Sequence, residues 1–142
     1  MTTFVDTNIL VYLLQSDSPF HKWAKEAFAQ RKEQGPLIIC DIVYSELSVN
    51  LDSVAATDKA IAELAVERLN FSNGELFRAG KAYQEHVSRG GSRTNVLPDF
   101  LIAAQAELNN APLMTNNQKE ILSYFPTVKM ICPPKESSGE SK

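Results

Sequence analysis

Three carboxylates and one amide occupy positions where strands end or helices begin. Asp6 follows the short apolar segment Thr3-Phe4-Val5, and Asn117 follows a later apolar pair by three residues. Glu46 lies on a helical segment after a second apolar run, and Asp99 lies in the first turn of an alanine-rich helical segment. In open parallel sheets, ligands bind beyond the carboxyl ends of the strands. We therefore expect these four side chains to converge at one edge of a sheet.

The carboxylates Asp6, Glu46 and Asp99 form a donor set suited to a hard divalent cation. Mg²⁺ and Mn²⁺ prefer carboxylate and water oxygens and require no His or Cys. A bound cation lowers the pKa of its water from about 15.7 towards neutrality, which supplies hydroxide for attack on phosphorus. Without metal the carboxylates repel one another, so at least one of them should have a raised pKa. The set predicts a metal site for phosphodiester hydrolysis.

Each position also has a purely structural interpretation. Asp6 could only cap a helix, and Asp99 could only complement a helix dipole. Glu46 could be an exposed helix residue, although Tyr44 and Leu47 beside it are apolar. Single positions therefore do not decide between structure and chemistry, and their combination carries the argument.

The elements that would position these residues are short apolar runs alternating with helical patterns. Strands are expected at Phe4–Val5, Leu37–Cys40, Leu113–Met114 and Val128–Ile131. Helices are expected at Ile9–Leu14, 19–34, 42–51, 57–69, 73–89, 98–109 and 119–124. Strands alternating with helices predict an α/β fold, with one domain over residues 1–132 whose central parallel β-sheet is flanked by helices on both faces. Residues 133–142 are rich in Pro, Ser, Lys and Glu, which predicts a disordered tail.

Local signals define several helix ends. Ser18 before Pro19 is a predicted N-cap, and Asp41 is interpreted as another. Ser72 and Glu75 fit a capping box. The helix that follows should place its larger apolar residues on one face, namely Leu76, Phe77, Gly80, Tyr83 and Val87.

Composition is that of a soluble globular protein. The chain has 142 residues, of which 44% are hydrophobic and 22% charged. It shows no secretory signal and no apolar run of about 20 residues that could span a bilayer. Cys40 and Cys132 are too few for a disulfide framework, so we expect a cytoplasmic protein. The net charge of −3 argues against binding nucleic acid by bulk charge alone, but a nuclease that uses bound cations needs no basic surface.

Four motifs, in this order, resemble those of a PIN domain. They are Phe4-Val5-Asp6-Thr7-Asn8-Ile9-Leu10, Ser45-Glu46-Leu47, Leu97-Pro98-Asp99-Phe100-Leu101-Ile102 and Leu113-Met114-Thr115-Asn116-Asn117. The resemblance extends from Thr3 to about Pro133, and its closest form is the VapC-type toxin ribonuclease of toxin–antitoxin pairs. The segment Arg89-Gly90-Gly91-Ser92-Arg93 also resembles that subgroup. The first and third motifs are fairly specific for this family, whereas a Ser-Glu-Leu triplet alone is not.

The resemblance implies a metal-dependent endoribonuclease that hydrolyses RNA phosphodiester bonds and is restrained by a small antitoxin protein. Asp6, Glu46 and Asp99 would then be the catalytic and metal-binding residues, with Mg²⁺ or Mn²⁺ as the cofactor. The products would carry 5′-phosphate and 3′-hydroxyl ends. Asn8 and Ser45 could orient the ligands or their water molecules.

Several other residues are candidates for contacts with RNA or with a second subunit, and each also has a structural interpretation. Arg89 and Arg93 could contact RNA phosphates, or belong to a solvated loop. The resemblance also implies a homodimer, with contacts near Trp23 and Phe28 or near Leu76 and Tyr83, although the first pair could equally be core. His21 and His86 are expected to be surface or packed side chains.

The sequence departs from the family pattern at Asn117, where the family usually has Asp. Asn can bind a metal only through its neutral oxygen, so the sequence favours one metal site over two. Glu120, three residues later, could compensate if its helix turns it inward.

Two other functions remain open. The first is a catalytically weakened PIN-fold module that binds RNA or a protein partner without cleavage. The second is a phosphotransferase or phosphatase of another α/β family, with Asp6 as nucleophile. That interpretation lacks the second Asp of the haloacid dehalogenase pattern, where this chain has Asn8, and also the acidic pair of a receiver domain.

Overall fold

A five-stranded sheet runs through the centre of the computed structural model, which describes residues 1–92 and 96–134. Its strands are β1 (Thr3–Val5), β2 (Leu37–Ile39), β3 (Glu67–Arg68), β4 (Leu113–Met114) and β5 (Met130–Ile131). They lie in the order β3-β2-β1-β4-β5, and every neighbouring pair is parallel. The predicted α/β architecture with a central parallel sheet is therefore confirmed.

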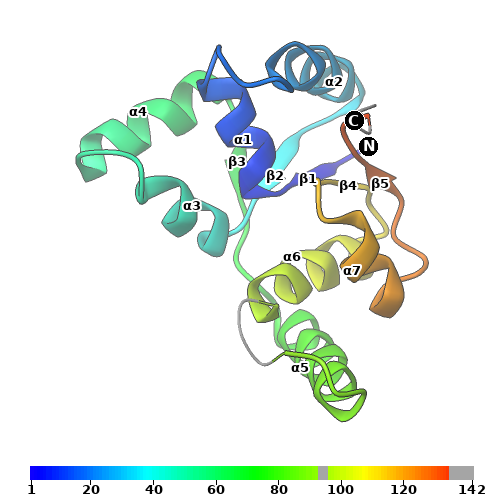
Figure 1. The fold of residues 1–142 in the computed structure, drawn as a ribbon. Coiled ribbons are helices and arrows are strands. Elements are labelled where there is room, and N and C mark those ends of the chain that lie inside the picture. Colours follow the sequence, from blue (N-terminus) through cyan, green and yellow to red (C-terminus); the bar gives the residue numbers. More distant parts are fainter. Residues whose placement is uncertain (93–95, 135–142) are drawn as a thin grey trace.

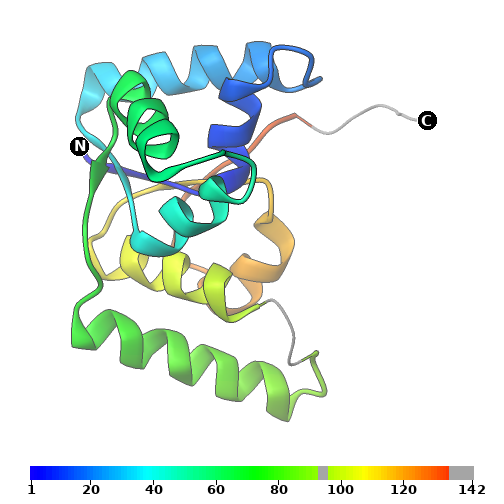
Figure 2. The same cartoon turned by 90° about the vertical axis from the view of Figure 1, so that its left-hand side faces the viewer.

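Helices cover the sheet on both faces, as predicted. They are α1 (Thr7–Leu14), α2 (His21–Gln34), α3 (Asp41–Ser48), α4 (Val54–Leu64), α5 (Asn73–Ser88), α6 (Leu97–Leu108) and α7 (Gln118–Tyr124). Helices α1 and α2 lie on one side of the sheet, while α5, α6 and α7 lie on the other (Figures 1 and 2). None of the described helices combines the length and apolar character needed to cross a membrane.

The central strands are buried on both faces. Thr3, Phe4 and Val5 of β1 are all buried, as are Leu113 and Met114 of β4. Continuous burial is expected of parallel strands covered by helices on both sides. Helix α6 packs beneath them with its buried alanines, Ala103, Ala104 and Ala106, whose small side chains allow a close approach.

The region from residue 53 to residue 69 differs from the prediction. Helix α4 begins after the N-cap Ser53 and ends at Leu64, because Ala65 adopts a left-handed conformation with φ 56°. Glu67 and Arg68 then form β3, an exposed two-residue edge strand on β2, where the sequence pattern predicted helix.

The helix caps are a second point of comparison. The capping box of Ser72 and Glu75 is confirmed, with hydrogen bonds of 3.1 and 2.9 Å. The two other predicted N-caps are wrong. Cys40 is the N-cap of α3, whereas Asp41 is its first residue and pairs with Arg68 at 2.8 Å. Helix α2 begins later than predicted, and Ser18 accepts a 3.2 Å bond from the backbone N–H of Phe20, the residue before that helix.

Helix α5 buries a different face from the one predicted. Its buried residues are Glu75, Ala79, Ala82 and His86, whereas Leu76 and Phe77 are exposed. The inner face of α5 carries small and hydrogen-bonded side chains because it packs closely against α6. Leu76 and Phe77 are left towards solvent, whereas Tyr83 is partly buried against the core.

Residues 133 and 134 continue the chain after β5. Residues 135–142, which make up most of the predicted disordered tail, lie outside the described residues.

Candidate functional site

The strand order changes direction at β1, which makes β1 the topological switch point of the sheet. From β1 the chain proceeds outward to β2 on one side and later returns to β4 on the other. Ligands of open α/β sheets bind at such a switch point. The backbone N–H of Asp6 donates to the carbonyl oxygen of Met114 at 2.9 Å, which places the ends of the two strands side by side.

Asp6 is buried at this edge, with only 4% of its surface exposed. Its Oδ1 accepts from the backbone N–H of Thr7 at 2.7 Å, so the residue also caps α1. Its Oδ2 accepts from the Thr115 hydroxyl at 2.8 Å. Burial raises the pKa of the Asp6 carboxyl, the two hydrogen bonds oppose this, and the charge of Glu46 adds to it. Capping and chemistry are therefore compatible at this position.

Glu46 reaches the same edge from the exposed side. It lies on α3, and its Oε1 accepts from the Thr7 hydroxyl at 2.6 Å. Thr7 follows Asp6 directly, so this bond joins the first and second sequence motifs. The exposed side chain has room to change its rotamer.

Asp99 lies in the first turn of α6, and its Oδ2 accepts from Nδ2 of Asn117 at 2.7 Å. Burial is the largest cause that raises the pKa of Asp99 to about 6, followed by the charge of Asp6. The charges of Glu46 and Glu120 raise it further, whereas the Asn117 hydrogen bond lowers it. The pKa is thus raised for both Asp6 and Asp99, mainly by burial, and the repulsion between carboxylates that the sequence predicted is a smaller contribution.

Asn117 points into the site and contacts Asp99, at the position the fourth motif assigns to it. Its backbone N–H also donates to the Thr115 hydroxyl at 3.1 Å. Glu120 does not occupy the same place, because its Oε1 lies 3.7 Å from Nδ1 of His86. Its charge nevertheless acts on Asp99.

The donor set fits a hard divalent cation in its chemistry. Asp6, Glu46 and Asp99 present carboxylate oxygens, and Asn117 adds an amide. In the part of the chain that the structure describes, no group of three or more His, Cys, Asp or Glu side chains is arranged to hold a metal ion. Coordination of one ion by all three carboxylates would therefore require side-chain rotation, for which exposed Glu46 is best placed.

Two hydroxyls that sequence reasoning did not single out hold the carboxylates. Thr7 donates to Glu46, and Thr115 donates to Asp6. Both lie within the motifs quoted above, next to Asp6 and between β4 and Asn117, so a search for donors beside the carboxylates could have found them. Asn8, predicted for such a role, donates to Asn116 at 2.7 Å. Ser45 is exposed on α3, and its carbonyl oxygen accepts from the Ser48 hydroxyl at 2.7 Å.

The predicted RNA contacts are only partly described. Arg89 forms an ion pair with Glu85, and its guanidinium lies 5.0 Å from the centre of the Tyr124 ring. Arg93 lies outside the described residues. His86 is buried, with Nε2 positioned 2.8 Å from the Ser92 carbonyl oxygen, so the packed interpretation of this residue is confirmed.

Comparison with known families decides the class of protein. A family model described as the PIN domain matches residues 3–123. The chain belongs to the PIN domain family. No curated protein matches it by sequence. The matched residues include all four motifs, whose polar side chains lie at the carboxyl edge of the sheet.

Solved structures of similar chains support the same fold for this PIN domain. VapBC2 from Rickettsia felis, bound to a promoter DNA fragment, matches with a TM-score of 0.71 and 24% identity over 94% of this chain and 100% of that one. VapBC-1 from nontypeable Haemophilus influenzae matches with a TM-score of 0.70 and 26% identity, over 93% of this chain and 98% of that one. A toxin–antitoxin complex from Klebsiella pneumoniae matches with a TM-score of 0.67 and 26% identity, over 94% of this chain and 98% of that one.

Proposed function

We propose that this PIN domain is a metal-dependent endoribonuclease and the toxin component of a toxin–antitoxin pair. The observation that carries the proposal is the placement of Asp6 and Asp99 at the switch point of the sheet, where burial and then the charge of Asp6 raise the pKa of Asp99 to about 6. Keeping two carboxylates close together in a partly buried place disfavours their charged forms. A divalent cation would offset that repulsion.

In this proposal Asp6, Glu46 and Asp99 hold Mg²⁺ or Mn²⁺. The bound cation would supply activated water and offset charge on the scissile phosphate. Thr115 and Thr7 fix the orientation of Asp6 and Glu46, and the Asn117 amide holds Asp99. Arg89 and Arg93 are proposed contacts for RNA phosphates, which would require Arg89 to leave Glu85.

A nuclease assay tests this function. The purified protein should cleave single-stranded RNA with Mn²⁺ and leave it intact with a chelator, giving 5′-phosphate and 3′-hydroxyl ends. Asp6→Asn protein prepared in the same way controls for contaminating nucleases. Equal cleavage by both proteins would contradict the assignment.

A second candidate is a PIN module that binds RNA or a protein without cleavage. Two observations favour it: Asn stands at position 117, and no preformed three-ligand cluster exists among the described residues. RNA binding without cleavage in Mg²⁺ and in Mn²⁺ would support this candidate over the nuclease.

The proposed partner is a small antitoxin that docks an apolar helix on the groove between α1 and α3. Leu14, Leu47 and Leu51 line this groove of about 170 Å³. It lies on the same two helices that carry Thr7 and Glu46, so a bound helix could extend a basic side chain to the carboxylates. Arg suits that role, because its guanidinium pairs with carboxylates in a bidentate manner.

Leu14→Glu should abolish co-purification with an antitoxin encoded beside this gene and leave the fold intact, since Leu14 is exposed. A partner whose binding leaves metal affinity and cleavage unchanged would exclude insertion of its side chain among the carboxylates.

We also propose a homodimer that uses the exposed face of α5. Phe77 is 67% exposed and Leu76 is 44% exposed, which is unusual for adjacent large apolar side chains. Phe28 is buried in the core, so the alternative contact near Trp23 and Phe28 is less favourable. Light scattering should give a dimer mass for the unaltered protein and a monomer mass for Phe77→Glu. A monomer mass for the unaltered protein at micromolar concentration would rule out this contact.

A further inference from the structure

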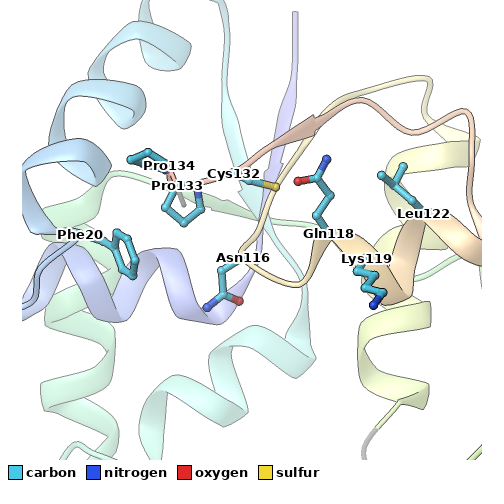
Figure 3. A pocket seen from close by; sticks show the side chains of 8 residues that line it. All are labelled: Phe20, Asn116, Gln118, Lys119, Leu122, Cys132, Pro133 and Pro134. Atoms are coloured by element: carbon cyan, nitrogen blue, oxygen red, sulfur yellow. The ribbon is translucent and has the colours of Figure 1, made fainter. Parts of the chain in front are cut away.

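A groove beside the carboxylates is built from three distant parts of the chain. Figure 3 shows Phe20 and the pair Pro133 and Pro134 on one side, with Gln118 and Lys119 on the other. Its volume is about 770 Å³, within the range of roughly 300–1,000 Å³ typical of ligand sites. The site described above uses none of these side chains.

The groove is continuous with the carboxylate site through one short segment. Thr115 binds Asp6, and Asn117 binds Asp99. Asn116, between them, lines the groove, and its amide bonds Asn8 and the Tyr12 hydroxyl at 2.7 and 2.6 Å. The segment 115–117 therefore contributes side chains both to the carboxylate site and to the groove.

The positively charged side chain of Lys119 lines the groove, while the carboxylate of the next residue, Glu120, lies beside His86. Successive residues of a helix point about 100° apart, and on α7 this places Lys119 at the groove and Glu120 beside His86. Within residues 1–92 and 96–134, the ion pairs are those of Arg68, Arg78, Arg89 and His86, so Lys119 is not neutralised by a carboxylate. The lining residues described include no acidic side chain.

The other side chains that line the groove are suited to contact nucleotide bases. Phe20 presents an aromatic ring whose orientation is fixed by contact with Tyr12, with ring centres 5.1 Å apart. Gln118 offers an amide donor and acceptor, whereas the Asn116 amide already bonds Asn8 and Tyr12. Aromatic side chains that stack bases, combined with a cation for the backbone, are the usual means of binding single-stranded nucleic acid.

We propose that this groove binds the single-stranded RNA segment adjacent to the scissile phosphate, with Lys119 on a phosphate and Phe20 against a base. The proposal rests on the ribonuclease function proposed above, but it makes a separate claim about binding. RNA binding in the groove does not require metal, whereas cleavage does.

Binding of a labelled octaadenylate RNA, measured by fluorescence anisotropy in chelator at low salt, tests the groove alone. Lys119→Gln should weaken binding about three- to tenfold and reduce the slope of log affinity against log salt by about 0.7, the value for one phosphate contact of a single strand. Phe20→Leu keeps the apolar contact with Tyr12 but removes the flat ring, and should weaken binding about fivefold. Lys129→Gln is the matched control, because Lys129 is an exposed lysine that lines a different cavity.

Cys132 provides a second readout that is independent of substitutions. It lines the groove and is partly exposed, whereas Cys40 is buried and burial raises the pKa of its thiol to about 11. Saturating RNA should slow labelling of Cys132 by a thiol reagent at least threefold. The proposal is overturned if octaadenylate does not bind, if Lys119→Gln matches Lys129→Gln, or if RNA leaves the labelling rate of Cys132 unchanged.

The two proposals fail in different ways. Lys119-dependent binding without any metal-dependent cleavage would support the groove and contradict the ribonuclease function. Metal-dependent cleavage that is equal in Lys119→Gln and Lys129→Gln would support the function and overturn the groove.

Discussion

The carboxylates at the two ends of α6 have different surroundings. Near its C-terminal end, Glu107 receives two hydrogen bonds from the Arg78 guanidinium, at 2.7 and 3.2 Å. In its first turn, Asp99 accepts a hydrogen bond from the neutral amide of Asn117, and the charges of Asp6, Glu46 and Glu120 raise its pKa. Among the residues that the structure describes, the same helix thus has one carboxylate paired with a guanidinium and one whose hydrogen-bond partner is a neutral amide. The proposed metal site uses the carboxylate whose described partner is neutral, and Glu107 provides an internal comparison on the same helix.

The largest expected difference is in catalysis. Asp99→Asn should lower Mn²⁺-dependent RNA cleavage by at least about a hundredfold, because it removes a ligand charge in the site. Glu107→Gln makes the same chemical change at the other end of α6 and should retain cleavage per folded molecule. Single-turnover cleavage assays measure both, and equal losses would mean that Asp99 acts only through the stability of α6.

The next effect concerns Asn117, which already contacts Asp99. Asn117→Asp adds a carboxylate at nearly constant volume, and opposite charges about 4 Å apart attract by about 4 kcal/mol at an effective dielectric constant of 20. Desolvation and repulsion will remove much of this, but about 1.4 kcal/mol would already give tenfold tighter Mn²⁺ binding. Glu120→Gln is the control for a compensating carboxylate. If Asn117→Asp alters neither Mn²⁺ affinity nor stability without metal, Asn117 has no part in the site.

Stability without metal should change with opposite signs at the two ends of α6. Asp99→Asn relieves repulsion and should raise the free energy of unfolding by about 1 kcal/mol, allowing for solvent screening of a partly exposed group. Glu107→Gln loses charge-assisted hydrogen bonds and should lower it by about 1 kcal/mol. Urea denaturation in chelator measures both. A decrease for both variants would contradict the contrast drawn here.

The pH dependence should be the smallest effect. The pKa of Asp99 is raised from 3.8 to about 6, so the folded protein binds a proton more tightly than the unfolded chain between these values. The stabilisation from this proton is complete below about pH 4 and is lost as the pH rises through 6. In chelator, the melting temperature of the unaltered protein should therefore fall from pH 5 to pH 7 more than that of Asp99→Asn. Parallel melting curves for the two proteins would remove Asp99 as the cause.

The sequence predicted the shared position of the four polar residues at one edge of the sheet better than it predicted some of the elements around them. Parallel strands that end at a common edge bring Asp6 and Asn117 together whatever the details of the helices, so topology alone predicted their proximity. The edge strand Glu67–Arg68 was missed because two exposed charged residues have no strand periodicity. The face of α5 was misjudged because its buried positions are small or polar, and only contact with α6 explains why they are inside.

The groove could not be predicted for a different reason. Phe20, Lys119 and Cys132 are far apart in the sequence and share no motif, so only the folded chain shows that they line one surface. Thr7 and Thr115 were within recognisable motifs, but their partners depend on side-chain directions that a sequence does not give.

Calorimetric titration of Mn²⁺ into the unaltered protein, Asp99→Asn and Glu107→Gln tests the central claim most directly, because it measures the ligand that the carboxylates of the site are proposed to hold. The account predicts binding to the unaltered protein, comparable binding to Glu107→Gln, and binding to Asp99→Asn that is at least about a hundredfold weaker. Unaltered Mn²⁺ affinity in Asp99→Asn would contradict it.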